Sequence, residues 1–361
     1  MDRNLRRVKK TIVTALQACV TLAILFLVFR NPQKRHEMAE IIRQADHMWL
    51  FAGFACYGVV EILAGIRWQI LLRIQGISLG WARLTMLLLI GVFFNYFIPG
   101  GTGGDVVKIF YLLKETPGKR SAALLTVLMD RVVGLMALIV MAGFLIATRW
   151  SWLVSAPDTA KAVWTCLIIL GAAVVGIGFS LIVSRFGLVH KLPGRLPGRD
   201  RLAEMAFAYD LHAKAWRPTL AAFVLSIGAH IAYFAVFFCP ALSFHASNVR
   251  IPTFGELCAI LPVINSILGM PISIGGLGLR EGLFKLFLGQ LCGVSDAVAV
   301  LMSSAGYLLT MAWGAIGGVI YLCYRPSEHL NLREIARSVA GMEHAVAEEE
   351  IALETAKTKE H

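Results

Sequence analysis

The chain has 361 residues, of which 57% are apolar and 16% are charged, whereas a typical soluble domain has roughly 45–50% and about 25%. This excess of apolar residues is too large for an ordinary globular core. The net charge of +11, from 34 Lys and Arg against 23 Asp and Glu, is of a size that nucleic-acid-binding proteins show, but here the basic residues mostly separate apolar runs and orient helices in a membrane. We therefore predict an all-α polytopic membrane protein with no nucleic-acid partner.

Six apolar runs are long enough to cross a hydrocarbon layer of ~30 Å as helices. The first follows a basic start and lacks a small-residue cleavage pattern, so we expect a retained span with a cytoplasmic amino terminus. All seven cysteines fall inside apolar segments, with no CxxC pair and no cluster at metal-ligand spacing, so we expect no disulfide framework, metal site or cofactor. The predicted spans are 11–29, 48–66, 121–148, 162–184, 219–243 and 297–324.

Two further apolar regions are interrupted by proline and glycine. Residues 84–98 stop at the sequence Pro-Gly-Gly-Thr-Gly-Gly-Asp, and residues 257–270 stop at Pro-Ile-Ser-Ile-Gly-Gly-Leu-Gly; a second short run follows each break. Apolar runs of about 10–14 residues are more often re-entrant than spanning. We therefore expect two re-entrant helical hairpins, near 84–113 and 257–292.

The distribution of basic residues supports this topology. A hairpin in the first region places the basic loops 67–83, 114–120 and 185–218 on one side, whereas a single crossing would move the last of them, with seven Lys and Arg, to the outside. A single crossing would therefore contradict the positive-inside rule, and the hairpin satisfies it. We expect a multi-pass protein of the plasma membrane with both termini in the cytoplasm.

The order of span, span, hairpin and span then occurs twice. Each half has an odd number of full crossings, so the second half is inserted upside down relative to the first, as in transporters built from inverted repeats. We divide the chain into a first membrane half, 1–161, a second membrane half, 162–324, and a cytoplasmic tail, 325–361.

The two breaks define the candidate site. Non-helical backbone inside a membrane must be packed in protein or line a wet cavity, and inverted-repeat transporters bind their substrates near the midplane. The helices that begin near Asp105 and Arg280 present amino termini, which favour anions. The candidate substrate-binding residues are Asn95, Gly103, Gly104, Asp105, Lys108, Asp130, Arg131, Gly275, Gly276, Arg280 and Glu281; none of them is expected to be catalytic.

Structural roles compete with binding at several of these positions. Asp105 is a suitable N-cap of its own helix. Asp130 and Arg131 either form structural ion pairs or contact a substrate phosphate, because charged residues at membrane depth face the protein interior. Glu281 has Lys285 at i+4, which suits a local pair. His230 is expected to be a packed, hydrogen-bonded side chain.

Together these segments carry a family resemblance. The stretch from Asn95 to Asp105, the Asp130-Arg131 pair with Gly134, and the stretch from Pro271 to Glu281 resemble the lysylphosphatidylglycerol synthase transmembrane region family, also described as flippase-like domain proteins of the UPF0104 type. The resemblance covers nearly all of residues 5–325. It implies a translocator of lipids or lipid-linked precursors, or an accessory to lipid synthesis such as hopanoid formation. Two-part members add a soluble aminoacyl-transferring domain, which the short tail here does not match, so no synthase activity is expected.

We therefore expect a non-enzymatic lipid translocator that binds an anionic headgroup, with a membrane phospholipid or other anionic lipid as its partner. The same breaks and charges would also suit a secondary transporter of a small soluble anion. A third alternative is a noncatalytic membrane partner of a lipid-synthesis enzyme. The chain has no nucleotide-binding motif, so transport would be downhill or ion-coupled.

Overall fold

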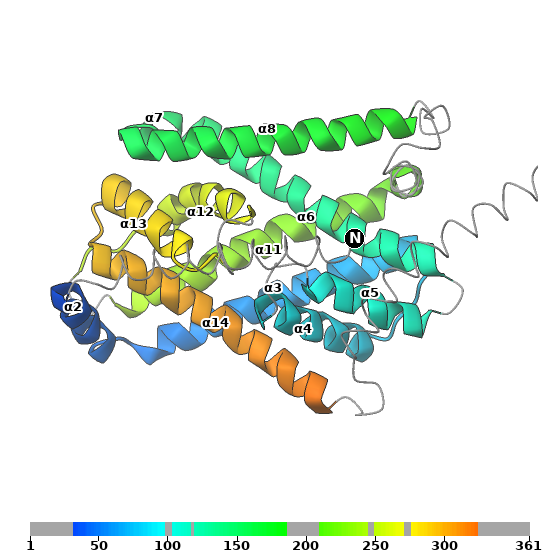
Figure 1. The fold of residues 1–361 in the computed structure, drawn as a ribbon, viewed down its shortest axis with the longest axis horizontal. Coiled ribbons are helices and arrows are strands. Elements are labelled where there is room, and N and C mark those ends of the chain that lie inside the picture. The colour runs from blue at the N-terminus through cyan, green and yellow to red at the C-terminus, as the bar shows by residue number, and fades with distance from the viewer. Residues whose placement is uncertain are drawn as a thin grey trace, which may run out of the picture.

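The computed structural model describes residues 32–97, 103–116, 119–185, 209–244, 249–270 and 276–323, and its regular elements there are helices (Figure 1). Five of these helices contain stretches long and apolar enough to cross a membrane. The prediction of an all-α polytopic membrane protein is confirmed, and each of the last five predicted spans coincides with one long helix. The first predicted span, 11–29, and the tail, 325–361, lie outside the described residues. The long helices are α3 (His47–Ile74), α6 (Arg120–Thr148), α8 (Pro157–Arg185), α11 (Trp216–Ser243) and α14 (Asp296–Cys323).

Two pairs of shorter helices occupy the predicted hairpin regions. The first pair is α4 (Trp81–Phe97) and α5 (Gly103–Glu115), and the second is α12 (Phe254–Leu268) and α13 (Leu279–Cys292). Their lengths of 17, 13, 15 and 14 residues are below the about 20 that a crossing helix needs. The two helices of each pair pack on one another, which makes each pair a helical hairpin. Entry of these hairpins from opposite faces of the membrane stays a prediction.

Local sequence determines several helix ends. The Asp46 carboxylate accepts a hydrogen bond from the Met48 N–H at 2.9 Å and caps α3. Thr253 and Glu256 form a reciprocal capping box at the start of α12. Gly293 follows α13 with φ +65°, a left-handed conformation that favours glycine. Thr253 thus marks the start, and Gly293 the end, of the second hairpin.

The helices of the two halves make corresponding contacts. Helix α3 packs along α11 through the middle of the molecule (Figure 1). The contact of α4 with α14 has its counterpart in that of α12 with α6, and the contacts of α3 with α6 and α14 have theirs in those of α11 with α14 and α6. This pattern is the one expected when an internal twofold axis relates each helix of one half to its counterpart in the other half. The division at residues 161 and 162, and the inverted insertion of the two halves, stay predictions.

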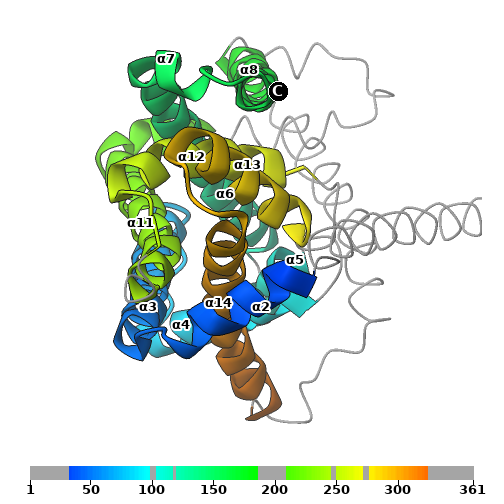
Figure 2. The same cartoon turned by 90° about the vertical axis from the view of Figure 1, so that its left-hand side faces the viewer.

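The remaining helices lie at the periphery of this core. Helix α8 runs along one side of the molecule and packs on the second hairpin, while the short α7 (Trp150–Leu153) joins it to α6. Helix α2 (Pro32–Arg43) crosses α14, as the end-on view shows (Figure 2).

One predicted loop is largely helical. The sequence expectation placed 67–83 between elements, but α3 continues to Ile74 and α4 begins at Trp81. Arg67 therefore lies inside α3. Arg83 lies in α4 and forms an ion pair with Glu115 of α5, which joins the two helices of the first hairpin.

Candidate functional site

A cavity of about 640 Å³ lies between the two halves of the protein. Seven helices contribute to its wall, α3, α4 and α6 from the first half and α11, α12, α13 and α14 from the second. Both hairpins reach it, the first through Tyr96 and the second through Leu268 and Arg280. Its lining residues are Val60, Ala64, Arg67, Tyr96, Asp130, Arg131, Gly134, Leu135, Leu138, Ser226, Ala229, His230, Tyr233, Asn265, Leu268, Gly269, Gly276, Arg280 and Tyr307.

The cavity wall carries more positively than negatively charged side chains. Three guanidinium groups, those of Arg67, Arg131 and Arg280, face one carboxylate, that of Asp130. Charged groups at membrane depth are costly unless they are paired or face a polar cavity. Asp130 pairs with Arg67, and Asp105 pairs with Arg131, so the three guanidinium groups exceed the carboxylates of these two ion pairs by one, and the cavity favours an anion.

Arg67 connects the two halves at the cavity wall. Its Nε donates to Asp130 Oδ1 at 2.7 Å, and its Nη1 donates to the Ser226 hydroxyl of α11 at 3.1 Å. Both charged side chains are mostly buried, with 15% and 12% of their surface exposed. The sequence left Asp130 and Arg131 either to structural ion pairs or to contact with a substrate phosphate; in the structure the partner of Asp130 is Arg67 of α3.

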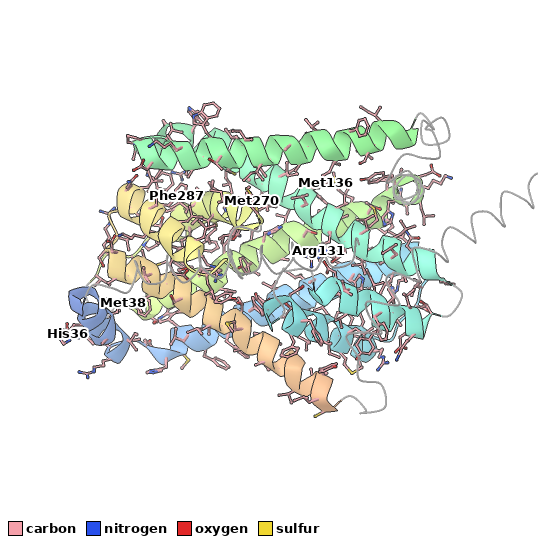
Figure 3. All side chains as sticks on the ribbon, in the orientation of Figure 1. His36, Met38, Arg131, Met136, Met270 and Phe287 are labelled. Atoms are coloured by element: carbon pink, nitrogen blue, oxygen red, sulfur yellow. The ribbon has the colours of Figure 1, made fainter. Side chains whose placement is uncertain are left out.

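Arg131 binds the first hairpin while it lines the cavity. Its Nε and Nη2 donate to the two carboxylate oxygens of Asp105 at 2.7 and 2.6 Å. Figure 3 shows Arg131 on α6 in the middle of the molecule, and 54% of its side chain is exposed. Asp105 therefore pairs with a residue of another helix, and the Arg131 guanidinium keeps an accessible edge.

Arg280 of α13 is the buried cation of the second hairpin. Only 4% of the residue is exposed, and its guanidinium carbon lies 3.8 Å from the centroid of the Tyr307 ring, a cation–π contact. Gly276 lies beside it with φ +75°, and a Cβ there would come within 3.2 Å of Arg280 Nη2. Glycine at this position thus permits both the turn and the approach of the guanidinium. Gly275 lies outside the described residues.

The predicted residues of the first hairpin, Asn95, Gly103, Gly104, Asp105 and Lys108, are not among those that line the cavity. The Asn95 side-chain oxygen accepts a hydrogen bond from Gly104 N at 2.9 Å, which closes α5 against α4. The Lys108 stem packs on Gly91, and its Nζ lies 5.4 Å from the Trp68 ring centroid.

Glu281 has a structural position. Its Oε2 accepts from Gly278 N at 2.6 Å at the start of α13, and its Oε1 accepts from the Ser303 hydroxyl at 3.3 Å. The expected local pair with Lys285 is absent, because Lys285 binds Asp296 at 3.0 Å. The carboxylate therefore holds the start of α13 against α14.

Several lining residues were not predicted as site residues. On α11, Ser226, His230 and Tyr233 follow one another at i, i+4 and i+7, a spacing that places them on one helix face. Polar residues at helical spacing within an apolar run are the sequence pattern from which these residues could have been predicted. His230 was expected to be packed, and its Nε2 lies 3.3 Å from the Gly134 carbonyl oxygen. Tyr96 and Tyr307 complete the polar wall with their rings 5.7 Å apart.

Comparison with known proteins supports the resemblance seen in the sequence. The family model described as the lysylphosphatidylglycerol synthase TM region matches residues 14–314. A UPF0104 membrane protein of Methanothermobacter thermautotrophicus is 25% identical over 88% of this chain and 95% of its own length. UPF0104 membrane proteins of Pyrococcus horikoshii and Methanocaldococcus jannaschii are 26% and 23% identical, over 34% and 35% of this chain and only 36% of their own lengths. Because the family model covers most of the chain, this protein belongs to the lysylphosphatidylglycerol synthase TM region family.

Proposed function

We propose that this protein moves an anionic lipid across the plasma membrane, without a chemical step, by holding the headgroup in the central cavity. The observation that carries the proposal is the wall of that cavity, where three guanidinium groups lie together and only two of them pair with a carboxylate in the ion pairs described above. Guanidinium groups bind phosphate through charge-assisted hydrogen bonds. Arg67 and Arg131 are held by ion pairs and Arg280 by the Tyr307 ring, so the cations are positioned before a ligand arrives.

The apolar part of the wall favours a lipid over a small soluble anion. Leu135 and Leu138 of α6 line the cavity, and Leu135 is also 39% exposed at the surface of the protein. Large exposed apolar side chains continue along the same helix at Val140 and Phe144. Acyl chains would follow this surface while the headgroup occupies the polar interior.

The test is transport of a fluorescent anionic lipid by purified protein in vesicles. The probe is phosphatidylglycerol with a nitrobenzoxadiazole label, and dithionite added outside reports the label on the outer leaflet. We expect faster exchange than in protein-free vesicles. Arg280→Ala should slow it by about 10–100-fold, because a hydrogen bond to a charged group contributes about 1.5–3 kcal/mol.

The matched control is Lys285→Ala on the same helix. Lys285 forms its ion pair with Asp296 outside the cavity wall, so exchange should keep the wild-type rate. Exchange no faster than in protein-free vesicles would contradict the proposal. If entrapped inorganic phosphate crossed instead, the protein would be a carrier of soluble anions. Co-purification of a lipid-synthesis enzyme without any transport would favour an accessory role.

A further inference from the structure

The two corresponding helix interfaces are packed differently. Between α4 and α14 the backbones meet closely: a Cβ on Gly317 would overlap the carbonyl group of Leu89, and a Cβ on Gly318 would lie 2.8 Å from the Phe93 ring. The interface is continued by Phe94 against Tyr321, with ring centroids 5.1 Å apart. Helices α4 and α14 are therefore held together by backbone contact and by aromatic rings in an edge-to-face arrangement.

The counterpart interface, between α6 and α12, is less extensive. Leu135 and Leu138 of α6 and Leu268 of α12 line the cavity. Ala142 and Ile146 of α6 are buried in one core cluster with Leu257 and Leu261 of α12, but a Cβ on Gly134 or Gly143, the two glycines of α6, would meet no α12 atom within 4 Å. The close glycine-to-backbone contact that joins α14 to α4 thus has no equivalent between α6 and α12.

The two hairpins also differ in whether their cation reaches the cavity. Lys108 and Arg280 are equivalent cations, because each lies four residues after the second glycine of its glycine pair. Arg280 lines the cavity, whereas Lys108 lies against Gly91 and over Trp68. The indole N–H of Trp68 is buried without a hydrogen-bond partner among the described residues, a donor that a bound oxyanion would satisfy.

We infer that this structure is one of two end states, and that Lys108 is the anion-binding cation of the other state, as Arg280 is of this one. In the second state each helix makes the contacts of its counterpart, so α4 separates from α14 while α6 closes on α12. With a cytoplasmic amino terminus, the closed side here faces the cytoplasm and the open side faces outward. The nature of the ligand rests on the proposed function; the exchange of contacts does not.

A disulfide across the closed interface tests the exchange. In a background without other cysteines, Phe93→Cys with Gly318→Cys replaces the ring that now covers the glycine and should cross-link on oxidation. We expect the oxidised protein to retain phosphatidylglycerol as the reduced protein does, but to translocate it at least tenfold more slowly, with recovery on reduction. Equal rates in both forms would overturn the inference.

The control disulfide joins α3 and α11, which pair with one another in both states. A Cβ on Gly53 would lie 3.2 Å from that of Cys239, so Gly53→Cys should cross-link with the native Cys239. This bond should leave translocation within twofold of the reduced rate. A tenfold loss here would show that any cross-link arrests the protein, and would remove the support from the first disulfide.

A distance measurement separates this inference from the proposed function. Nitroxide labels at Ala82→Cys and the native Cys323, both exposed at the ends of α4 and α14, should give two distances by pulsed electron paramagnetic resonance. A single distance, with and without phosphatidylglycerol, would overturn the inference even if the lipid were bound and moved. Two distances in a protein that binds no anionic lipid would overturn the proposed function alone.

Lys108 has its own test in the cross-linked protein. With α4 and α14 joined, Arg280→Ala should lower phosphatidylglycerol retention at least tenfold, and Lys108→Ala should leave it unchanged. In the reduced protein both variants should slow translocation, because each cation serves one end state. Equal loss of retention in the cross-linked protein would place both cations in one state and contradict the inference.

Discussion

Arg131 of α6 donates two hydrogen bonds to the carboxylate of Asp105 on α5, so a residue of the cavity wall also fastens the first hairpin. A bidentate pair of this kind is directional as well as charged. The pair is partly exposed, with 54% of the Arg131 side chain and 17% of the Asp105 side chain accessible. Exchanging the two charged residues should therefore separate the role of the pair in stability from the role of Arg131 in anion binding.

Exchanging these two charges should restore the fold but not the binding. Asp105→Arg alone and Arg131→Asp alone should each lower the free energy of unfolding by about 1 kcal/mol or more, measured by thermal unfolding in detergent. The double variant should recover most of this loss, because the pair is remade with opposite polarity. Its phosphatidylglycerol retention should stay low, since the cavity now carries a carboxylate in place of a guanidinium. Full retention would contradict a binding role for Arg131.

Removing Asp130 should destabilise the protein strongly. Asp130→Ala leaves the mostly buried Arg67 guanidinium without its carboxylate, and breaking a buried ion pair in this way costs about 3–5 kcal/mol. Thermal unfolding of the purified variant measures the effect. Asp158→Ala is the control, because its ion pair with Lys161 is exposed, and no measurable change is expected. Similar unfolding temperatures for both variants would show that the Arg67 pair contributes little.

The glycines of α14 and α6 should respond differently to added volume. Gly317→Val forces a side chain into the Leu89 carbonyl group and should lower the free energy of unfolding by about 1–3 kcal/mol. Gly143→Val enters open space and should change it by less than about 0.5 kcal/mol. Both measurements use thermal unfolding in the same detergent. A larger effect at Gly143 would contradict the close packing of Gly317 on α4.

The predicted orientation is measurable by cysteine labelling in intact cells. Gly80 and Ser155 are both exposed, one before α4 and one before α8. In a background without native cysteines, a membrane-impermeant maleimide should label Ser155→Cys from outside and reach Gly80→Cys only after permeabilisation. Labelling of both positions from outside would contradict re-entry of the first hairpin or the cytoplasmic amino terminus.

The membrane helices were predictable because their signal is local. A run of apolar residues must be long enough to match the bilayer, and this length is read directly from the sequence. The same argument identified α4, α5, α12 and α13 as too short to cross. The error at residues 67–83 arose because a charged residue was taken as the end of a span, whereas Arg67 is accommodated inside α3 by its partners Asp130 and Ser226.

Partner choice was less predictable. The sequence paired Glu281 with Lys285 and left Asp130 beside Arg131, because neighbours in a helix are the only contacts that spacing reveals. The structure instead pairs Lys285 with Asp296 and Arg131 with Asp105. The lining role of Tyr96 and Tyr307 depends on the meeting of α4 and α14, which no local pattern encodes.

The sequence by itself determined the membrane class, the long helices and the two interrupted hairpins, because hydrophobic length and helix-breaking residues act within a single segment. Only the tertiary structure decided which cations share the cavity and which remain covered. Charge pairing and close packing depend on helices far apart in the chain. Arg280 faces the cavity and Lys108 lies over Trp68, although the two occupy equivalent places after their glycine pairs.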